Sequence, residues 1–75
     1  MKISDLQDKI IINVNNGKEI GKISDLEIDN NGTIINYYAL TKRSLFNIFN
    51  SNEETIFKTS DIKKIGEDVI LVQID

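Results

Sequence analysis

The chain has 75 residues with no cysteine and no histidine, and its formal net charge is −3 at pH 7. This composition excludes disulfides and the common zinc ligand sets, and the negative charge disfavours a protein that mainly grips a nucleic-acid backbone. The length predicts one domain over residues 1–75, whose small core gains from self-association, most simply as a homodimer. Asp5 and Asp8 interrupt any signal peptide and no apolar run could span a membrane, so we expect a cytoplasmic protein.

The pentapeptide KISDL occurs at residues 2–6 and 22–26, and a looser echo, TSDIKKI, begins at Thr59. A third copy at the same spacing is missing, which argues against a repeat fold. Both copies fit the S-x-x-[EQ] capping box that opens a helical turn, at Ser4 and at Ser24. An apolar run follows the first copy, whereas an Asn-Asn-Gly turn follows the second almost at once. We therefore predict a capped turn for the first copy and a strand for the second.

Two Asn-Gly pairs, at residues 16–17 and 31–32, mark β-hairpins. This dipeptide is typical of a type I′ turn, which needs positive φ at both central residues. The flanking segments 10–14, 19–29 and 33–40 are therefore predicted to form a three-stranded meander.

The middle strand of this meander carries apolar residues at a spacing of three, which strict alternation cannot place on one face: Ile20, Ile23 and Leu26. A β-bulge bends a strand and resets its alternation. We predict such a bulge at Gly21 or at the Ser24-Asp25 pair.

Residues 41–54 form a connection that is longer than most loops. A strand follows at 55–57, then a short turn that contains Ile62 and Ile65, and a last strand over 69–74 that is apolar on both faces. Such a strand needs cover on both sides. The pattern predicts an all-β fold: a small, partly open β-barrel, about the size of an SH3 domain, with five to seven short strands and single helical turns.

No set of residues indicates catalysis, because the remaining reactive side chains are carboxylates, lysines, tyrosines and hydroxyls. The acids Asp25, Glu27 and Asp29 are interpreted as a solvated face, since a small barrel has no interior cleft for paired carboxylates. The stretch EIDNNG at 27–32 resembles the start of a calcium loop, but Tyr38 stands where the bidentate glutamate belongs, so a hairpin is favoured. We expect no enzyme activity, no catalytic residue, no cofactor and no metal site.

An alternative function is that of an RNA- or ribosome-associated accessory protein. It would use two basic pairs, Lys42-Arg43 and Lys63-Lys64, with Tyr37 or Tyr38 stacking on a base. Two isolated pairs in an acidic chain make nucleic acid the less favoured partner.

The segment LFNIF is the strongest candidate contact site, since four large apolar side chains stand three and four apart: Leu45, Phe46, Ile48 and Phe49. Burying all four is worth about 6 to 10 kcal/mol. Either the segment folds back onto its own barrel or it docks on a partner or second copy. In the docking interpretation the last strand contributes Ile70, Val72 and Ile74.

The C-terminal stretch IKKIGEDVILV, residues 62–72, resembles the PRC-barrel family, most closely the short stand-alone sporulation proteins of Gram-positive spore formers (YlmC/YmxH type). The opening KISDLQDKIII, the strand GKEIGKISDLEID and the LFNIF segment follow in the order of that subgroup. The resemblance implies a compact β-barrel without known catalysis that serves as a protein-interaction or assembly module, associated with sporulation.

Overall fold

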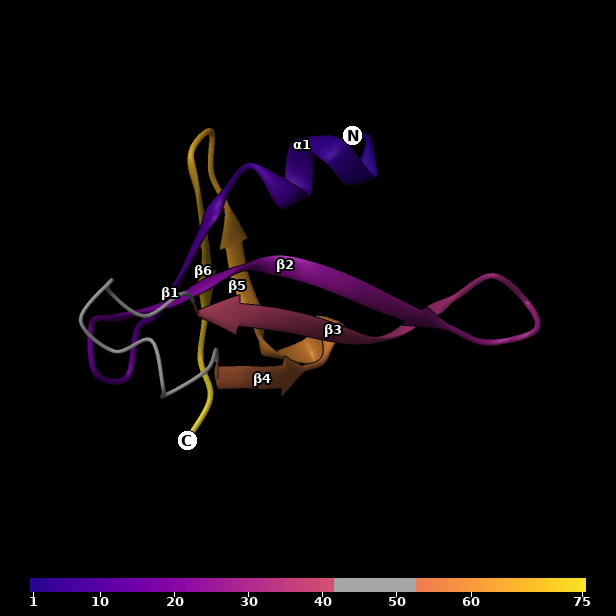
Figure 1. Ribbon diagram of the computed structural model, residues 1–75. Helices are drawn as coiled ribbons and strands as arrows, with labels where there is room; N and C mark the ends of the chain where they lie inside the picture. The colour runs from indigo at the N-terminus through magenta and orange to yellow at the C-terminus, as the bar shows by residue number, and fades with distance from the viewer. Residues whose placement is uncertain (42–52) are drawn as a thin grey trace.

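The computed structural model describes residues 1–41 and 53–75 as a curved sheet with two short helical turns (Figure 1). Its elements in chain order are α1 (Ile3–Gln7), β1 (Ile10–Asn13), β2 (Lys18–Ile28), β3 (Ile34–Thr41), β4 (Glu53–Phe57), the 3-10 turn η2 (Thr59–Asp61), β5 (Ile62–Ile65) and β6 (Val69–Val72). The strand order is β4-β3-β2-β1-β6-β5. The prediction of an all-β fold with single helical turns is confirmed.

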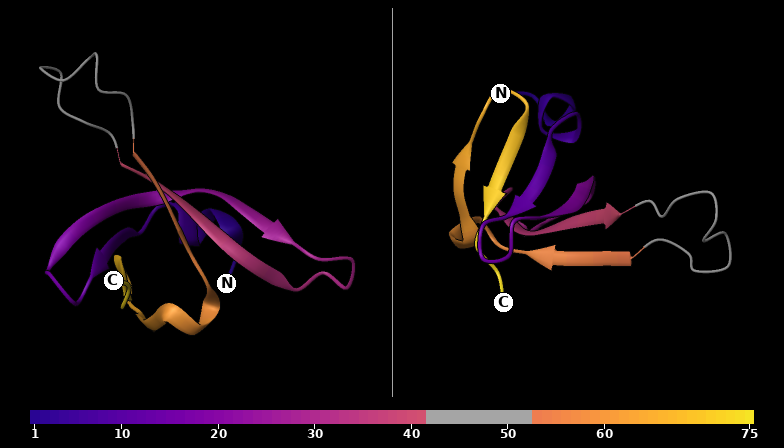
Figure 2. Two further views of the ribbon diagram at one scale, coloured as in Figure 1. Left: turned by 90° about the horizontal axis from the view of Figure 1, so that it is seen from below. Right: turned by 90° about the vertical axis from the view of Figure 1, so that its left-hand side faces the viewer.

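Strand β2 belongs to both halves of this sheet. Its first residues pair with β1, and the stretch from Lys22 to Ile28 pairs with β3. The sheet curves along β2, so that β1, β6 and β5 lie side by side at an angle to β3 and β4 (Figure 2). Among the described residues β4 and β5 remain as the two edges, which makes the barrel partly open.

Gly21 lies where β2 passes from one half to the other. Its φ is 131°, and an ideal Cβ at this position would come within 2.2 Å of the Leu40 carbonyl oxygen. Backbone therefore occupies the space that any side chain would need, and only glycine allows β2 and β3 to approach this closely.

The predicted bulge in β2 is at Ser24. The register with β3 shifts between Ile23 and Asp25, and the Ser24 hydroxyl donates to the Tyr38 carbonyl at 3.1 Å. This bulge resets the alternation between Ile23 and Leu26, and a second register shift, between Ile11 and Ile12 of β1, leaves Ile20 as an extra residue of β2. Ile23 is buried, and Ile20 and Leu26 pack against the core. The predicted bulge at the Ser24-Asp25 pair is confirmed, but the three residues reach the core through two register shifts and not through one.

The three-stranded meander is also confirmed, but the predicted type I′ turns are wrong. Gly17 and Gly32 have φ of 70° and 84°, and no other residue type has a positive φ in the described part of the chain. Both loops are longer than a two-residue turn, and each uses a single left-handed glycine. In the second loop the Asp29 carboxylate stabilises this form by accepting the backbone N–H groups of Asn31 and Thr33 at 2.8 and 3.0 Å.

The two KISDL copies adopt different structures, as predicted. The first forms α1, while the second lies within β2. The predicted cap at Ser4 is wrong, because the helix already begins at Ile3 and the Asp5 carboxylate accepts the Lys2 N–H at 2.9 Å. The echo repeats this device: Asp61 accepts the Lys58 N–H at 2.9 Å and opens η2.

The segment Ile62–Ile65 was expected to be a turn, and the structure shows it as the edge strand β5. Ile62 pairs with Val72, and Ile65 pairs with Ile70. Ile62 and Ile65 are three residues apart in β5, whereas their partners are two residues apart in β6. A register shift at Lys63 absorbs the odd residue, which simple alternation in the sequence does not reveal.

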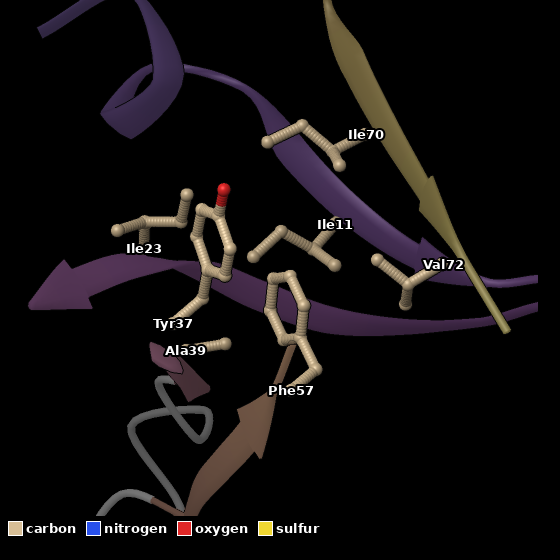
Figure 3. Close-up of a cluster of buried hydrophobic side chains, with 7 residues drawn as sticks. All are labelled: Ile11, Ile23, Tyr37, Ala39, Phe57, Ile70 and Val72. Atoms are coloured by element: carbon tan, nitrogen blue, oxygen red, sulfur yellow. The ribbon is translucent and has the colours of Figure 1, made fainter. Parts of the chain in front are cut away.

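The core lies between the two halves of the sheet. Figure 3 shows its seven buried side chains, which come from every strand except β5: Ile11, Ile23, Tyr37, Ala39, Phe57, Ile70 and Val72. In this core the Tyr37 and Phe57 rings stack across β3 and β4.

Candidate functional site

The apolar segment with Leu45, Phe46, Ile48 and Phe49 lies outside the described residues, as do Lys42 and Arg43. The structure describes the two strand ends on either side of it. Thr41 at the end of β3 pairs with Glu53 at the start of β4. The ends of these two strands therefore lie side by side at one edge of the sheet.

The three candidate residues of the last strand occupy different environments. Ile70 and Val72 are 0% exposed and belong to the core of this chain. Their side chains therefore have no free surface for a second molecule. Ile74 lies beyond the end of β6, is half-buried and packs at the edge of the core.

Asn13 holds the chain end in this position, a role that the sequence analysis missed. Its side chain is 5% exposed, and its amide donates to the Ile74 carbonyl at 2.9 Å. Its Oδ1 accepts the N–H groups of Asn15 at 3.1 Å and Ile74 at 3.3 Å. A polar residue that ends an apolar strand was the available signal, because a buried amide needs partners for both ends.

The opposite face of β1 and β6 points away from the core. The parallel register places Ile10 beside Val69 and Ile12 beside Leu71, and all four side chains are half-buried. Apart from Asn13, both strands are therefore apolar on their two faces, as the sequence indicated for β6. We call this group of four side chains the outer apolar block.

Opposite charges flank the outer apolar block. Glu19 on β2 pairs with Ile12, Ile12 with Leu71, and Leu71 with Lys64 on β5. Directly paired residues point to the same face of a sheet, so these four side chains form one row across four strands. The row runs from an exposed acid through two aliphatic residues to an exposed base.

Lys9 is a second buried polar residue that the sequence analysis passed over. It is 9% exposed, and its ammonium donates to the Gly66 carbonyl at 2.7 Å and to the Glu67 carbonyl. The cavity beside it has a volume of about 450 Å³ and is lined by Met1, Asp5, Asp8, Lys9, Glu67 and Asp68. Lys9 thus ties the start of β1 to the turn between β5 and β6.

Another depression, of about 480 Å³, lies between α1 and the β2–β3 hairpin. Ile3 and Ile28 line it and are 56% and 61% exposed, and the partly buried Leu26 and Ile34 line it too. Its surface is mainly apolar, which is typical of regions that contact other molecules.

The two neighbouring tyrosines differ in whether their rings are available for stacking with a nucleic-acid base. Tyr37 is buried against Phe57, whereas Tyr38 lies on the outer face, where its hydroxyl donates to Glu27 Oε1 at 3.1 Å. The hydrogen bond to Glu27 raises the pKa of Tyr38 above 10.0, and partial burial together with the charges of Glu27, Glu54 and Asp25 adds to the increase. These carboxylates make the surroundings of Tyr38 unfavourable for a phosphate backbone.

The acidic residues have structural contacts within the β2–β3 hairpin. Glu27 Oε1 also accepts the Asn36 amide at 2.7 Å, and Asp29 stabilises the hairpin loop, so the hairpin interpretation of EIDNNG is confirmed.

Within residues 1–41 and 53–75, no three acidic residues converge in a way that could hold a metal ion. The helices in this same part of the chain are all too short or too polar to cross a membrane.

Comparison with known proteins agrees with this geometry. The family model for the PRC-barrel domain matches residues 1–75. The chain is also similar to the protein named "Probable sporulation protein YlmC" of Bacillus subtilis (strain 168), with 37% identity over 75 residues that cover 99% of this chain and 93% of that protein.

Proposed function

The chain belongs to the PRC-barrel domain family, and on that basis we propose that it is a non-enzymatic protein-interaction or assembly module of the sporulating cell. The sporulation setting is supported by the name of the Bacillus subtilis relative. A cytoplasmic location and self-association, most simply as a homodimer, are part of the proposal. The lack of histidine and cysteine supports a role without catalysis.

The segment LFNIF is the observation that carries this proposal. Leu45, Phe46, Ile48 and Phe49 stand together in a connection between paired strand ends, in a chain whose described core is built by other strands. We propose residues 45–49 as the main contact surface for a protein partner. Ile74 adjoins the edge of the core and is the candidate contribution of the chain end, since Ile70 and Val72 are enclosed.

An RNA-associated role receives less support. Lys63 and Lys64 are exposed, but the half-buried Tyr38 stands among carboxylates and Tyr37 is buried. Binding to RNA would depend steeply on salt. Retention of a mixed-sequence RNA by the purified protein at low salt, lost at higher salt, would favour this alternative over the proposal.

The proposal is tested with the double variant Phe46→Ser/Phe49→Ser. Formaldehyde crosslinking in sporulating cells, followed by purification of the tagged chain, should lose its crosslinks to other proteins in this variant, while circular dichroism and thermal unfolding show a retained fold. The control is Ile35→Ser/Ile56→Ser, which removes two aliphatic residues that are 41% and 53% exposed elsewhere on the surface. Equal crosslinking by the wild type and both variants would contradict the proposed contact surface.

A further inference from the structure

We infer that the outer face of β1 and β6 is a contact surface for a second copy of this chain, related to the first by a two-fold axis that runs along the strands. This inference rests on the proposed role in protein contact, but it uses a different surface from residues 45–49. Its basis is the row that joins Glu19, Ile12, Leu71 and Lys64.

The outer apolar block is suited to an apolar partner. Ile10 and Val69 lie side by side, as do Ile12 and Leu71, so four aliphatic side chains form a compact group on one face. In the described part of the chain, the main contacts of β1 and β6 are with their neighbours in the sheet. Strands with apolar residues on both faces are stable when both faces are covered, and here one face already covers the core.

The charges at the two flanks identify the occupant. A two-fold axis parallel to the strands places β2 of one copy opposite β5 of the other. Glu19 then faces Lys64 of the second copy, and the same contact occurs again on the other side of the axis. Self-complementarity of this kind is the requirement for a symmetric dimer interface.

The same charges also select the orientation. The alternative is a two-fold axis that runs along this row, perpendicular to the strands and between the two sheets. It would place Glu19 opposite Glu19 of the second copy and Lys64 opposite Lys64. Repulsion between like charges disfavours that arrangement. Both axes leave the strands of the two copies aligned, as in most stacked sheets, so the charges alone select between them.

The size of the face predicts a weak dimer. Four strands about 4.8 Å apart make a row only about 14 Å wide, and stable interfaces usually cover about 800 Å² on each partner. We therefore expect self-association that reverses on dilution, with a dissociation constant of about 10 μM to 1 mM.

The test is a charge swap measured by sedimentation equilibrium of the full chain at low salt over a range of concentrations. Glu19→Lys and Lys64→Glu each turn two attractive contacts into repulsive ones, and each should raise the dimer dissociation constant by about tenfold. The double variant Glu19→Lys/Lys64→Glu reverses both charges and should return to within about threefold of the wild type. Added salt should weaken the wild-type dimer.

Two control variants make the same charge changes on exposed residues outside this row, Glu54→Lys and Lys58→Glu. They should leave the dissociation constant within about threefold of the wild type. Glu19→Lys brings the net charge closer to zero, so weaker association in this variant cannot come from general repulsion.

A chain that stays monomeric at all these concentrations would overturn the inference, as would a double variant that dimerises no better than the single variants. This outcome is distinct from failure of the proposed function. Phe46→Ser/Phe49→Ser should leave the dimer constant unchanged, whereas the charge variants should keep the partner crosslinks. If the phenylalanine variant abolishes the dimer and the charge variants do not, residues 45–49 form the self-contact and the inference made here is wrong.

Discussion

The rings of Tyr37 and Phe57 lie nearly parallel, with their centroids 5.1 Å apart and an angle of 4° between their planes. The two residues are directly paired across β3 and β4. The Tyr37 hydroxyl also accepts a hydrogen bond from Thr59 Oγ1 at 3.1 Å. This stack therefore connects β3, the edge strand β4 and η2 at the centre of the core.

Phe57→Ala should leave the chain largely unfolded at 25 °C. Truncating a buried phenylalanine costs about 3 to 5 kcal/mol, and a domain of this size has little more net stability than that. Phe57→Leu keeps most of the volume and should lower the free energy of unfolding by less, about 1 to 2 kcal/mol. Urea titrations followed by circular dichroism provide the measurement. Ile56→Ala, at a side chain that is 53% exposed, is the control and should change stability by less than about 1 kcal/mol.

Gly21→Ala should destabilise the chain by more than about 2 kcal/mol, because the new methyl group meets a backbone carbonyl that cannot move without breaking the sheet. Gly17→Ala is the matched control, since this glycine also has positive φ but no atom within 4 Å of the added Cβ. It should cost about 1 kcal/mol. Thermal unfolding of both variants measures the difference, and equal losses would show that the close approach to Leu40 does not matter.

Asn13→Ala should lower the free energy of unfolding by about 1 to 3 kcal/mol, because it leaves both backbone groups of Ile74 without their buried partner. Asn15 also donates to the Ile74 carbonyl, at 3.0 Å, but from an exposed position. Asn15→Ala should therefore cost less than about 1 kcal/mol. Hydrogen exchange at the Ile74 amide should increase in the Asn13 variant. Unchanged exchange there would contradict the role assigned to Asn13.

Glu27→Gln should lower the pKa of Tyr38 toward its ordinary value, because it removes the charged acceptor that holds the phenol in its protonated form. Because the pKa of Tyr38 is higher in the folded chain than in the unfolded chain, the protonated phenol contributes to the stability of the fold. This contribution is fully present below about pH 10, the unfolded value, and is lost as the pH rises through the folded pKa. Alkaline titration of phenolate absorbance measures the shift. The variant Tyr38→Phe leaves Tyr37 as the only tyrosine, so its titration shows which of the two phenol transitions of the wild type belongs to Tyr38. A titration curve identical in the wild type and Glu27→Gln would contradict this account.

Local patterns predicted much of the fold. The Asn-Gly pairs located the hairpins between β1, β2 and β3, and the spacing of Ile23 and Leu26 predicted the bulge found at Ser24. These features depend on residues that are close together in the chain, so their signals are visible in the sequence. The edge strand β5 was not predicted, because its pairing with β6 includes a bulge that breaks the alternation.

The surface features could be predicted only in part. The sequence indicated that the last strand is apolar on both faces, but it did not show that Ile70 and Val72 are the enclosed pair. The candidate residues 45–49 lie outside the described part of the chain, so their proposed role still rests on their composition. The row from Glu19 to Lys64 brings together residues from four strands, and no local pattern contains that register.

The pentapeptide KISDL separates the two kinds of information. By itself, the sequence determined the class of fold, the hairpins and the places where glycine or a bulge was needed, because these follow from backbone sterics and from the period of the apolar residues. The residues that follow each copy also predicted a helical turn for the first and a strand for the second. Only the tertiary structure decided that the turn begins at Ile3 and that Asp25 of β2 pairs with Tyr38. The physical reason is that five residues have weak intrinsic preferences, which the hydrogen bonds and packing of neighbouring strands readily override.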